Sequence, residues 1–256
     1  MATLELSNVT LEYPLFKSIK RGVLASLGQS RFLGGQLQRT SEKSAKVVAL
    51  SNINLKLGDG DRVAVFGHNS SGKTTLLKTL SGFYKPQQGH VHTVGRIASV
   101  LNMVSGLRMS MSAEDNIDLS LVLAGVPQNE RLERKTQILV NSQLGEFACL
   151  PIEKLSSGML MRLAFSISTI SDPDILLLDE WVGVGDLRFI DKAKVRLEEL
   201  VERSGLLVYA THNPTIANKL CNQAICLHRG EIVMRGTVNE VSDYYRQSME
   251  SGPTEN

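Results

Sequence analysis

Residues 62–80 read Arg-Val-Ala-Val-Phe-Gly-His-Asn-Ser-Ser-Gly-Lys-Thr-Thr-Leu-Leu-Lys-Thr-Leu. The segment 62–66 is mostly apolar and β-branched, which predicts a short buried strand. The spacing of the leucines within residues 74–80 predicts a helix. A glycine-containing loop separates the predicted strand from this helix. A strand, a glycine loop and a helix in this order are typical of an α/β nucleotide-binding unit, so this stretch predicts an α/β core.

The loop has the spacing G-x-x-x-x-G-K-[ST]. Glycines in such a loop let backbone N–H groups surround phosphate oxygens at a helix N-terminus. We expect Lys73 to reach the β- and γ-phosphates of ATP, Thr74 to bind Mg²⁺ through its hydroxyl, and Thr75 to face the α-phosphate. The predicted nucleotide-binding residues of the loop are Gly67, Asn69, Ser70, Ser71, Gly72, Lys73, Thr74 and Thr75. A glycine-rich turn without a ligand is the structural alternative.

Two carboxylates follow a second predicted buried strand, residues 175–178. They are Asp179 and Glu180, and ligands of open α/β sheets sit at this carboxyl end of the strands. Asp179 is expected to hold Mg²⁺ through water. Glu180 is expected to accept a proton from the water that attacks the γ-phosphate. A solvated acidic turn is the alternative for this pair.

Further elements are visible on both sides of these motifs. Near-alternating apolar residues predict half-exposed strands at 4–9 and 50–57, and apolar runs predict buried strands at 206–210 and 224–227. The segment of about 112–171 has a helical pattern throughout. It opens at a capping-box sequence, Ser112 to Asp115, and Gly125 with Pro127 ends its first helix. The segment therefore predicts a helical subdomain set into the α/β core.

Composition sets limits on the class of protein. Of the 256 residues 42% are hydrophobic and 21% charged, which is ordinary for a soluble globular chain. No apolar run is long enough for a membrane span, and the N-terminus lacks a signal-peptide pattern, so the chain is expected to stay in the cytoplasm. The three cysteines form no C-x-x-C pair, which favours reduced thiols. A net charge of +2 provides no argument for nucleic acid binding.

The stretch Leu155-Ser-Ser-Gly-Met159 begins 24 residues before Asp179. That arrangement resembles the ATP-binding cassette (ABC) ATPases. In that family, the signature serine and glycine cap a helix and donate to the γ-phosphate held by the glycine loop of the partner subunit. Ser156 and Gly158 are the matching positions here. Taken without the family, Ser156 is simply a good N-cap residue.

The resemblance extends to the remaining motifs of the family. Asp186 stands where the family has its D-loop aspartate, and His212 stands where a histidine contacts the γ-phosphate and orients the catalytic glutamate. Tyr13 matches the aromatic residue that stacks on adenine. The resemblance therefore implies nucleotide-binding roles for Tyr13 and Asp186 and a catalytic role for His212. The pair His90 and His92 is interpreted as one face of a strand.

One position departs from the family pattern. The loop that normally offers a glutamine to Mg²⁺ falls in residues 97–106, and no glutamine is present there. Asn102 is the best substitute as a metal ligand, with a shorter side chain.

Within the family, the chain is most similar to ATPase subunits that export bacterial polysaccharides such as O-antigen, capsule, teichoic acid and cell-wall galactan. The features that carry this resemblance are the Ser-Ser-Gly-Met signature, Asp179-Glu-Trp-Val-Gly-Val-Gly-Asp186, Glu114-Asp-Asn-Ile117, and Tyr13-Pro-Leu-Phe16 before a long insertion. The chain is expected to lack the carbohydrate-binding domain that some members of this group append, so selectivity for the polymer is expected elsewhere.

The resemblance implies an α/β nucleotide-binding domain over residues 1–247, with an antiparallel β edge, followed by a flexible tail, 248–256. It implies a homodimer that closes on two ATP and two Mg²⁺ at the cytoplasmic face of the bacterial inner membrane. The resemblance also implies two copies of a separate transmembrane permease. The permease, and not this subunit, would contact the glycan directly. Alternatives are an exporter ATPase for another glycan or a small molecule, a soluble non-transport ABC protein acting on nucleic acid or ribosomes, and an inactive nucleotide-binding scaffold. Intact Lys73, Asp179, Glu180 and His212 disfavour the last.

The insertion of about 14–46 is not required by this chemistry. Seven basic residues and one acid lie between Lys17 and Lys46. Over residues 15–27, apolar side chains fall on one helical arc, and Lys17, Lys20 and Arg21 fall on the adjoining arc. This pattern predicts a basic amphipathic helix in peripheral contact with the membrane or the permease. A surface helix packed on its own domain is the alternative.

Overall fold

The computed structural model describes residues 1–15, 36–41, 44–101, 103–104, 106–170, 172–180 and 187–250. Within these ranges, no helix combines the length and the apolar character needed to cross a membrane. All three cysteines are free, as the sequence predicts.

A six-stranded sheet in the order β10-β9-β4-β8-β7-β6 forms the centre of the fold. Its strands are β4 (Arg62–Phe66), β6 (Ile97–Val100), β7 (Ile175–Asp179), β8 (Leu206–Ala210), β9 (Gln223–His228) and β10 (Glu231–Gly236). Neighbouring strands are parallel except for β9 and β10, which are antiparallel. Because β4, β8 and β7 are adjacent and parallel, the segments that follow their C-terminal ends meet at one edge of the sheet.

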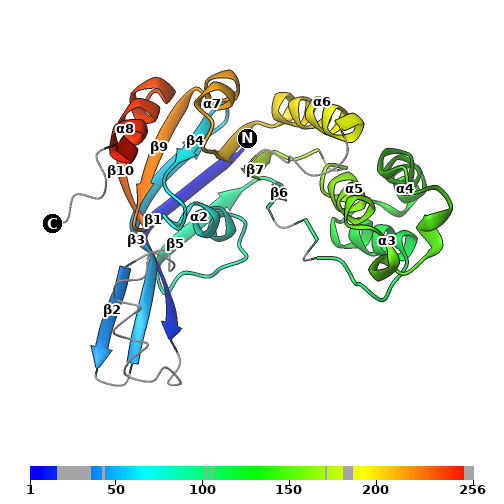
Figure 1. The fold of residues 1–256 in the computed structure, drawn as a ribbon, viewed down its shortest axis with the longest axis horizontal. Helices are drawn as coiled ribbons and strands as arrows, with labels where there is room; N and C mark the ends of the chain where they lie inside the picture. The colour runs from blue at the N-terminus through cyan, green and yellow to red at the C-terminus, as the bar shows by residue number, and fades with distance from the viewer. Residues whose placement is uncertain are drawn as a thin grey trace.

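A second sheet supplies the predicted antiparallel β edge. Its strands, in the order β2-β3-β1-β5, are β1 (Thr3–Leu15), β2 (Gln36–Ser41), β3 (Ser44–Gly58) and β5 (Gln88–Val94). Figure 1 shows β2 and the adjoining ends of β1 and β3 projecting from the body of the molecule as an arm. His90 and His92 both lie on the exposed face of β5, as predicted.

Helices and the second sheet cover both faces of the central sheet. Along β4, Val63 and Val65 belong to a core shared with β1, β3 and α2 (Lys73–Leu80). Ala64 and Phe66 point the other way, into a cluster with residues of α7 (Pro214–Leu220) and α8 (Val238–Glu250). A third cluster joins β7 and β8 to α6 (Leu187–Arg203). Since both faces are buried, these strands are apolar at successive positions instead of alternating.

Three α-helices gather at one end of the molecule, and α5 among them packs against the central sheet through Phe165 (Figure 1). They are α3 (Ala113–Leu123), α4 (Gln128–Ser142) and α5 (Ser157–Ser168), with short 3₁₀ helices at Gly145–Cys149 and Ile152–Lys154. These helices share a buried cluster of their own. The fold class is therefore the one that the sequence predicts, an α/β core with an antiparallel edge and a helical subdomain.

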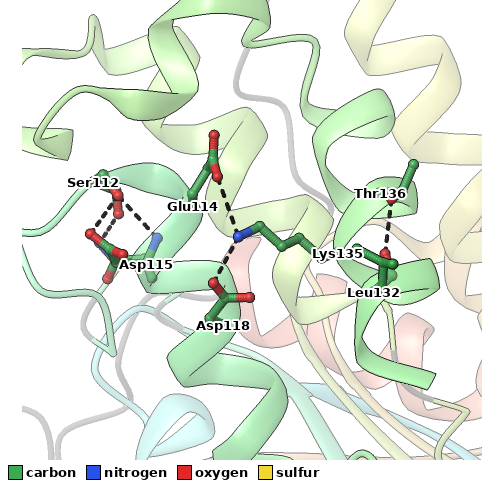
Figure 2. Close-up of polar contacts among 8 residues, drawn as sticks. Ser112, Glu114, Asp115, Asp118, Leu132, Lys135 and Thr136 are labelled. Atoms are coloured by element: carbon green, nitrogen blue, oxygen red, sulfur yellow. Dashed lines mark hydrogen bonds and ion pairs between the residues drawn. The ribbon is translucent and has the colours of Figure 1, made fainter. Parts of the chain in front are cut away.

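Local sequence explains how α3 begins and how it is held to α4. The Ser112 hydroxyl caps α3, since Oγ accepts the Asp115 N–H at 3.0 Å and donates to Asp115 Oδ2 at 2.6 Å (Figure 2). From α4, Lys135 Nζ reaches across to Asp118 at 2.7 Å and to Glu114 at 3.3 Å (Figure 2). The capping-box sequence thus sets the start of α3, and one lysine links the two helices.

We expect replacement of Asn116 by alanine to destabilise this subdomain. The side chain is 1% exposed, accepts the Arg108 N–H at 2.7 Å and donates to the carbonyls of Arg108 and Ser112 at 3.0 and 2.8 Å. Removing it leaves buried backbone groups unpaired, so the free energy of unfolding should fall by about 2 to 3 kcal/mol. Urea unfolding measures this difference. The exposed Asn239→Ala variant is the control, and equal stability of the two variants would contradict the expectation.

Two boundaries predicted from the sequence are wrong. Leu15, expected to begin a helix, ends β1 and pairs with Ala45 of β3, because the β1–β3 ladder continues to that residue. The rest of the predicted helix, 16–27, lies outside the described residues. Ser248, predicted to begin a flexible tail, lies in α8, which continues to Glu250, and its Oγ donates to the Tyr245 carbonyl at 2.6 Å; residues 251–256 lie outside the described ranges.

Candidate active site

Two glycines shape the loop between β4 and α2. Gly67 and Gly72 have φ values of +150° and +110°, in the region that favours glycine. A Cβ at Gly67 would lie 2.4 Å from the Leu227 carbonyl oxygen, and one at Gly72 would lie 2.9 Å from that of Ala49. Gly72 is also the N-cap of α2 and provides no side-chain cap, so the first N–H groups of α2 remain available to an anion.

Lys73 is the first residue of α2 and folds back over the loop. Its Nζ donates to the carbonyls of Gly67 at 2.7 Å and His68 at 3.1 Å. Burial lowers the pKa of Lys73 from its usual value, while the carboxylates of Asp179 and Glu180 act in the opposite direction. Two backbone carbonyls and two nearby carboxylates thus direct the ammonium group towards the cavity.

A cavity of about 650 Å³ lies in front of this loop. The residues that line it come from β1, β3, the glycine loop, α2 and the end of β7: Tyr13, Val47, Ala49, Asn69, Ser70, Gly72, Lys73, Thr74, Thr75, Asp179 and Glu180. Inside it, the Thr74 hydroxyl donates to Asp179 Oδ2 at 2.6 Å. A hydroxyl and a carboxylate oxygen this close are hard oxygen donors of the kind that Mg²⁺ prefers, so the pair fits such an ion together with substrate phosphates and water.

One wall of the cavity is aromatic and apolar. The ring of Tyr13 meets that of Tyr84 edge to face, with centroids 5.7 Å apart. Burial is the largest of the effects that raise the pKa of Tyr13 to about 12, and the neighbouring Tyr84 adds to it. The Tyr13 hydroxyl therefore stays neutral at physiological pH. Val47 and Ala49 of β3 complete this side. A neutral aromatic ring beside small apolar side chains offers a surface on which a nucleobase can stack.

Glu180 also lines the cavity and directly follows β7. Its φ is +59°, an unusual conformation for a residue with a side chain, and its N–H donates to the Ala210 carbonyl at the end of β8 at 2.9 Å. Backbone strain of this kind costs about 1 to 3 kcal/mol and is found at functional sites. The glutamate is therefore held in place by the adjacent strand.

His212 follows β8 and reaches the same place. Its Nε2 lies 3.2 Å from Glu180 Oε1 and 3.2 Å from Lys73 Nζ. Burial, and secondly the Lys73 ammonium, lower the pKa of His212, so the imidazole is neutral near pH 7. The segments following β4 and β7 thus bring Lys73 and Glu180 each to 3.2 Å from His212, which follows β8.

Some predicted residues lie away from this cluster. Ser156 caps α5, its hydroxyl accepting the Met159 N–H at 3.3 Å, and neither it nor Gly158 lines the cavity. A Cβ at Gly158 would meet nothing within 4 Å, so the start of α5 is an open surface. Asn102 and Asp186 lie outside the described residues.

Ser71 and Gly67 shape the loop but do not line the cavity. Ser71 is buried, and its backbone N–H donates to the His68 carbonyl at 3.0 Å. Four residues at the site were not predicted from the sequence: Val47, Ala49, Tyr84 and Tyr245. The Tyr245 hydroxyl lies 2.8 Å from His212 Nδ1. The apolar run Val47 to Leu50 indicated only a buried strand segment, and no pattern distinguishes Tyr245 from any other helical tyrosine.

Comparison with known proteins agrees with this geometry. The family model described as ABC transporter matches residues 50–183. The chain is 34% identical over 91% of its length to the O-antigen export system ATP-binding protein RfbE of Yersinia enterocolitica, covering 97% of that protein. It is 32% identical over 93% of its length to the teichoic acids export ATP-binding protein TagH of Listeria monocytogenes, covering 68% of it.

Solved structures show the same fold. A dimeric structure of the ATP-binding cassette MJ0796, in a post-hydrolysis state with ADP and phosphate, has a TM-score of 0.66 to this chain, with 23% sequence identity. The match covers 92% of this chain and 98% of that one.

Proposed function

The chain belongs to the ABC transporter family, and from that premise we propose that it hydrolyses ATP to power the export of a polysaccharide. It is an ABC ATPase domain that binds nucleotide. The observation that carries the catalytic assignment is the convergence of Lys73, Glu180 and His212 beside one cavity, from three adjacent strand ends. We infer that the chain up to Glu250, the end of α8, forms one nucleotide-binding domain, since the core clusters join elements from both ends of the chain.

Each group at the site has a separate task in this proposal. Lys73 and the N–H groups of the loop bind the β- and γ-phosphates, and Tyr13 stacks on the adenine. Thr74 and Asp179 would hold Mg²⁺, which neutralises phosphate charge when bound. Glu180 takes the proton of the attacking water, and His212 keeps Glu180 in position.

The active site is proposed to be shared between two copies of this chain. The open start of α5, with Ser156 and Gly158, does not line the cavity of its own chain, and we infer that it closes over the γ-phosphate in the partner's cavity. The dimeric MJ0796 structures, which have this fold, support a dimer of this kind.

The proposed cargo follows from the relatives. Proteins that match nearly the whole chain are named as ATP-binding subunits of O-antigen and teichoic acid export systems. We therefore propose that this subunit works at the cytoplasmic face of the bacterial inner membrane, bound to two copies of a permease that carries the glycan. ATP-driven closing and opening of the dimer would move that permease.

A complementation experiment tests the proposed export. In native cells without the gene, we expect the wild-type chain to restore polysaccharide at the surface, whereas Lys73→Ala leaves the polymer inside the cell, since the phosphates lose their ammonium partner. Surface and intracellular polymer are measured separately with a glycan stain. The exposed Lys85→Ala variant is the control and should restore export. Normal surface polymer in cells without the gene would contradict the proposal.

A further inference from the structure

His212 has two ring nitrogens with different partners. Nε2 faces Glu180 Oε1 and Lys73 Nζ, each at 3.2 Å. A carboxylate at Nε2 requires an N–H there, whereas an ammonium group requires a lone pair. Which of the two His212 binds therefore depends on the tautomer of the ring, and the group at Nδ1 sets that tautomer.

The group at Nδ1 is the hydroxyl of Tyr245, at 2.8 Å. Tyr245 belongs to α8, the last helix of the described residues, and is 7% exposed. Its ring packs against Phe66 at the end of β4, with centroids 5.8 Å apart, and edge to face against His68 of the loop, at 5.5 Å. Because the rings of Phe66 and His68 pack against Tyr245, its hydroxyl is held in place relative to the imidazole of His212.

The protonation states of the two groups are those in which the phenol can donate to the imidazole. Burial raises the pKa of Tyr245, and the nearby Cys226 and Glu180 add to the effect, so the phenol keeps its proton. The imidazole is neutral because burial and the Lys73 ammonium lower the pKa of His212. When the phenol donates to the lone pair of Nδ1, the ring proton stands on Nε2, where the Glu180 carboxylate, an acceptor only, lies 3.2 Å away.

We propose that Tyr245 is a positioning residue for ATP hydrolysis: its hydroxyl donates to His212 Nδ1 and so holds the ring proton on Nε2. With that proton, Nε2 donates to Glu180 Oε1 and aligns the carboxylate that accepts the proton of water. Nε2 then has no lone pair for Lys73, whose ammonium group keeps the carbonyls of Gly67 and His68. The proposal rests on the proposed roles of Glu180 and His212, and it assigns α8 a direct part in the chemistry.

The Tyr245→Phe variant removes the hydroxyl and keeps the ring. We expect its kcat for ATP to fall about three- to tenfold, the equivalent of one hydrogen bond, with the KM for ATP unchanged. The Tyr244→Phe variant, at an exposed position of the same helix, is the matched control and should keep wild-type kcat and thermal stability. Combined with His212→Ala, Tyr245→Phe should cause no further loss, since it acts through His212.

Nitrogen-15 NMR of the imidazoles tests the tautomer directly. The wild-type protein should carry the His212 proton on Nε2, and Tyr245→Phe should move part of it to Nδ1; the signal lost in His212→Ala provides the assignment. A wild-type proton on Nδ1, or an unchanged kcat in Tyr245→Phe while His212→Ala is inactive, would overturn the role of Tyr245. Full activity of His212→Ala would instead overturn the proposed role of the histidine.

Discussion

The Glu180→Gln variant should hydrolyse ATP about 10²- to 10⁴-fold more slowly than the wild type while binding ATP with similar affinity. The reason is positional, because Glu180 lies at the end of β7 in contact with His212, beside the cavity and not in the phosphate loop. An amide of the same shape still fills the site but takes no proton from water. The variant should therefore accumulate as an ATP-bound dimer, which light scattering detects.

The control for this experiment is the Glu202→Gln variant. It makes the same change of charge at an exposed residue of α6 that does not line the cavity. It should show wild-type turnover and no ATP-dependent dimer. Wild-type turnover in Glu180→Gln itself would mean that another group accepts the proton, and the assignment of the base would then be wrong.

Mixing two inactive subunits should restore ATP-dependent dimerisation if the site is shared between chains. Lys73→Ala damages the phosphate loop, and Ser156→Arg damages the capped start of α5. Both variants also carry Glu180→Gln. In a homodimer of either variant, both of the active sites shared between the two chains are damaged. A mixed dimer has one intact site and one doubly damaged site, so it should form with ATP when neither homodimer does.

Light scattering at equal total protein concentration compares the mixture with each variant alone. Those two single-variant samples are the controls, since they contain the same substitutions without the intact combination. A mixture that stays monomeric with ATP would argue that α5 does not complete the partner's site.

The sequence by itself determined the parts of this protein that depend on short segments. The glycine loop, its strand and its helix can be recognised from neighbouring residues because each conformation depends on φ angles and on periodicity within a few positions. The same holds for the caps at Ser112 and Ser156, whose partners are three residues away. Asp179 and Glu180 were predictable because they end an apolar strand.

Only the tertiary structure decided which of these segments meet. The parallel order of β4, β8 and β7 brings Lys73, Glu180 and His212 together, and it depends on pairing between strands that are distant in the chain. The antiparallel pairing of β1 with β3 similarly made Leu15 a strand residue instead of the start of a helix. Tyr245 reaches His212 across 33 residues because α8 packs behind β4. A contact of that kind arises from the packing of buried faces, which leaves no local pattern in the sequence.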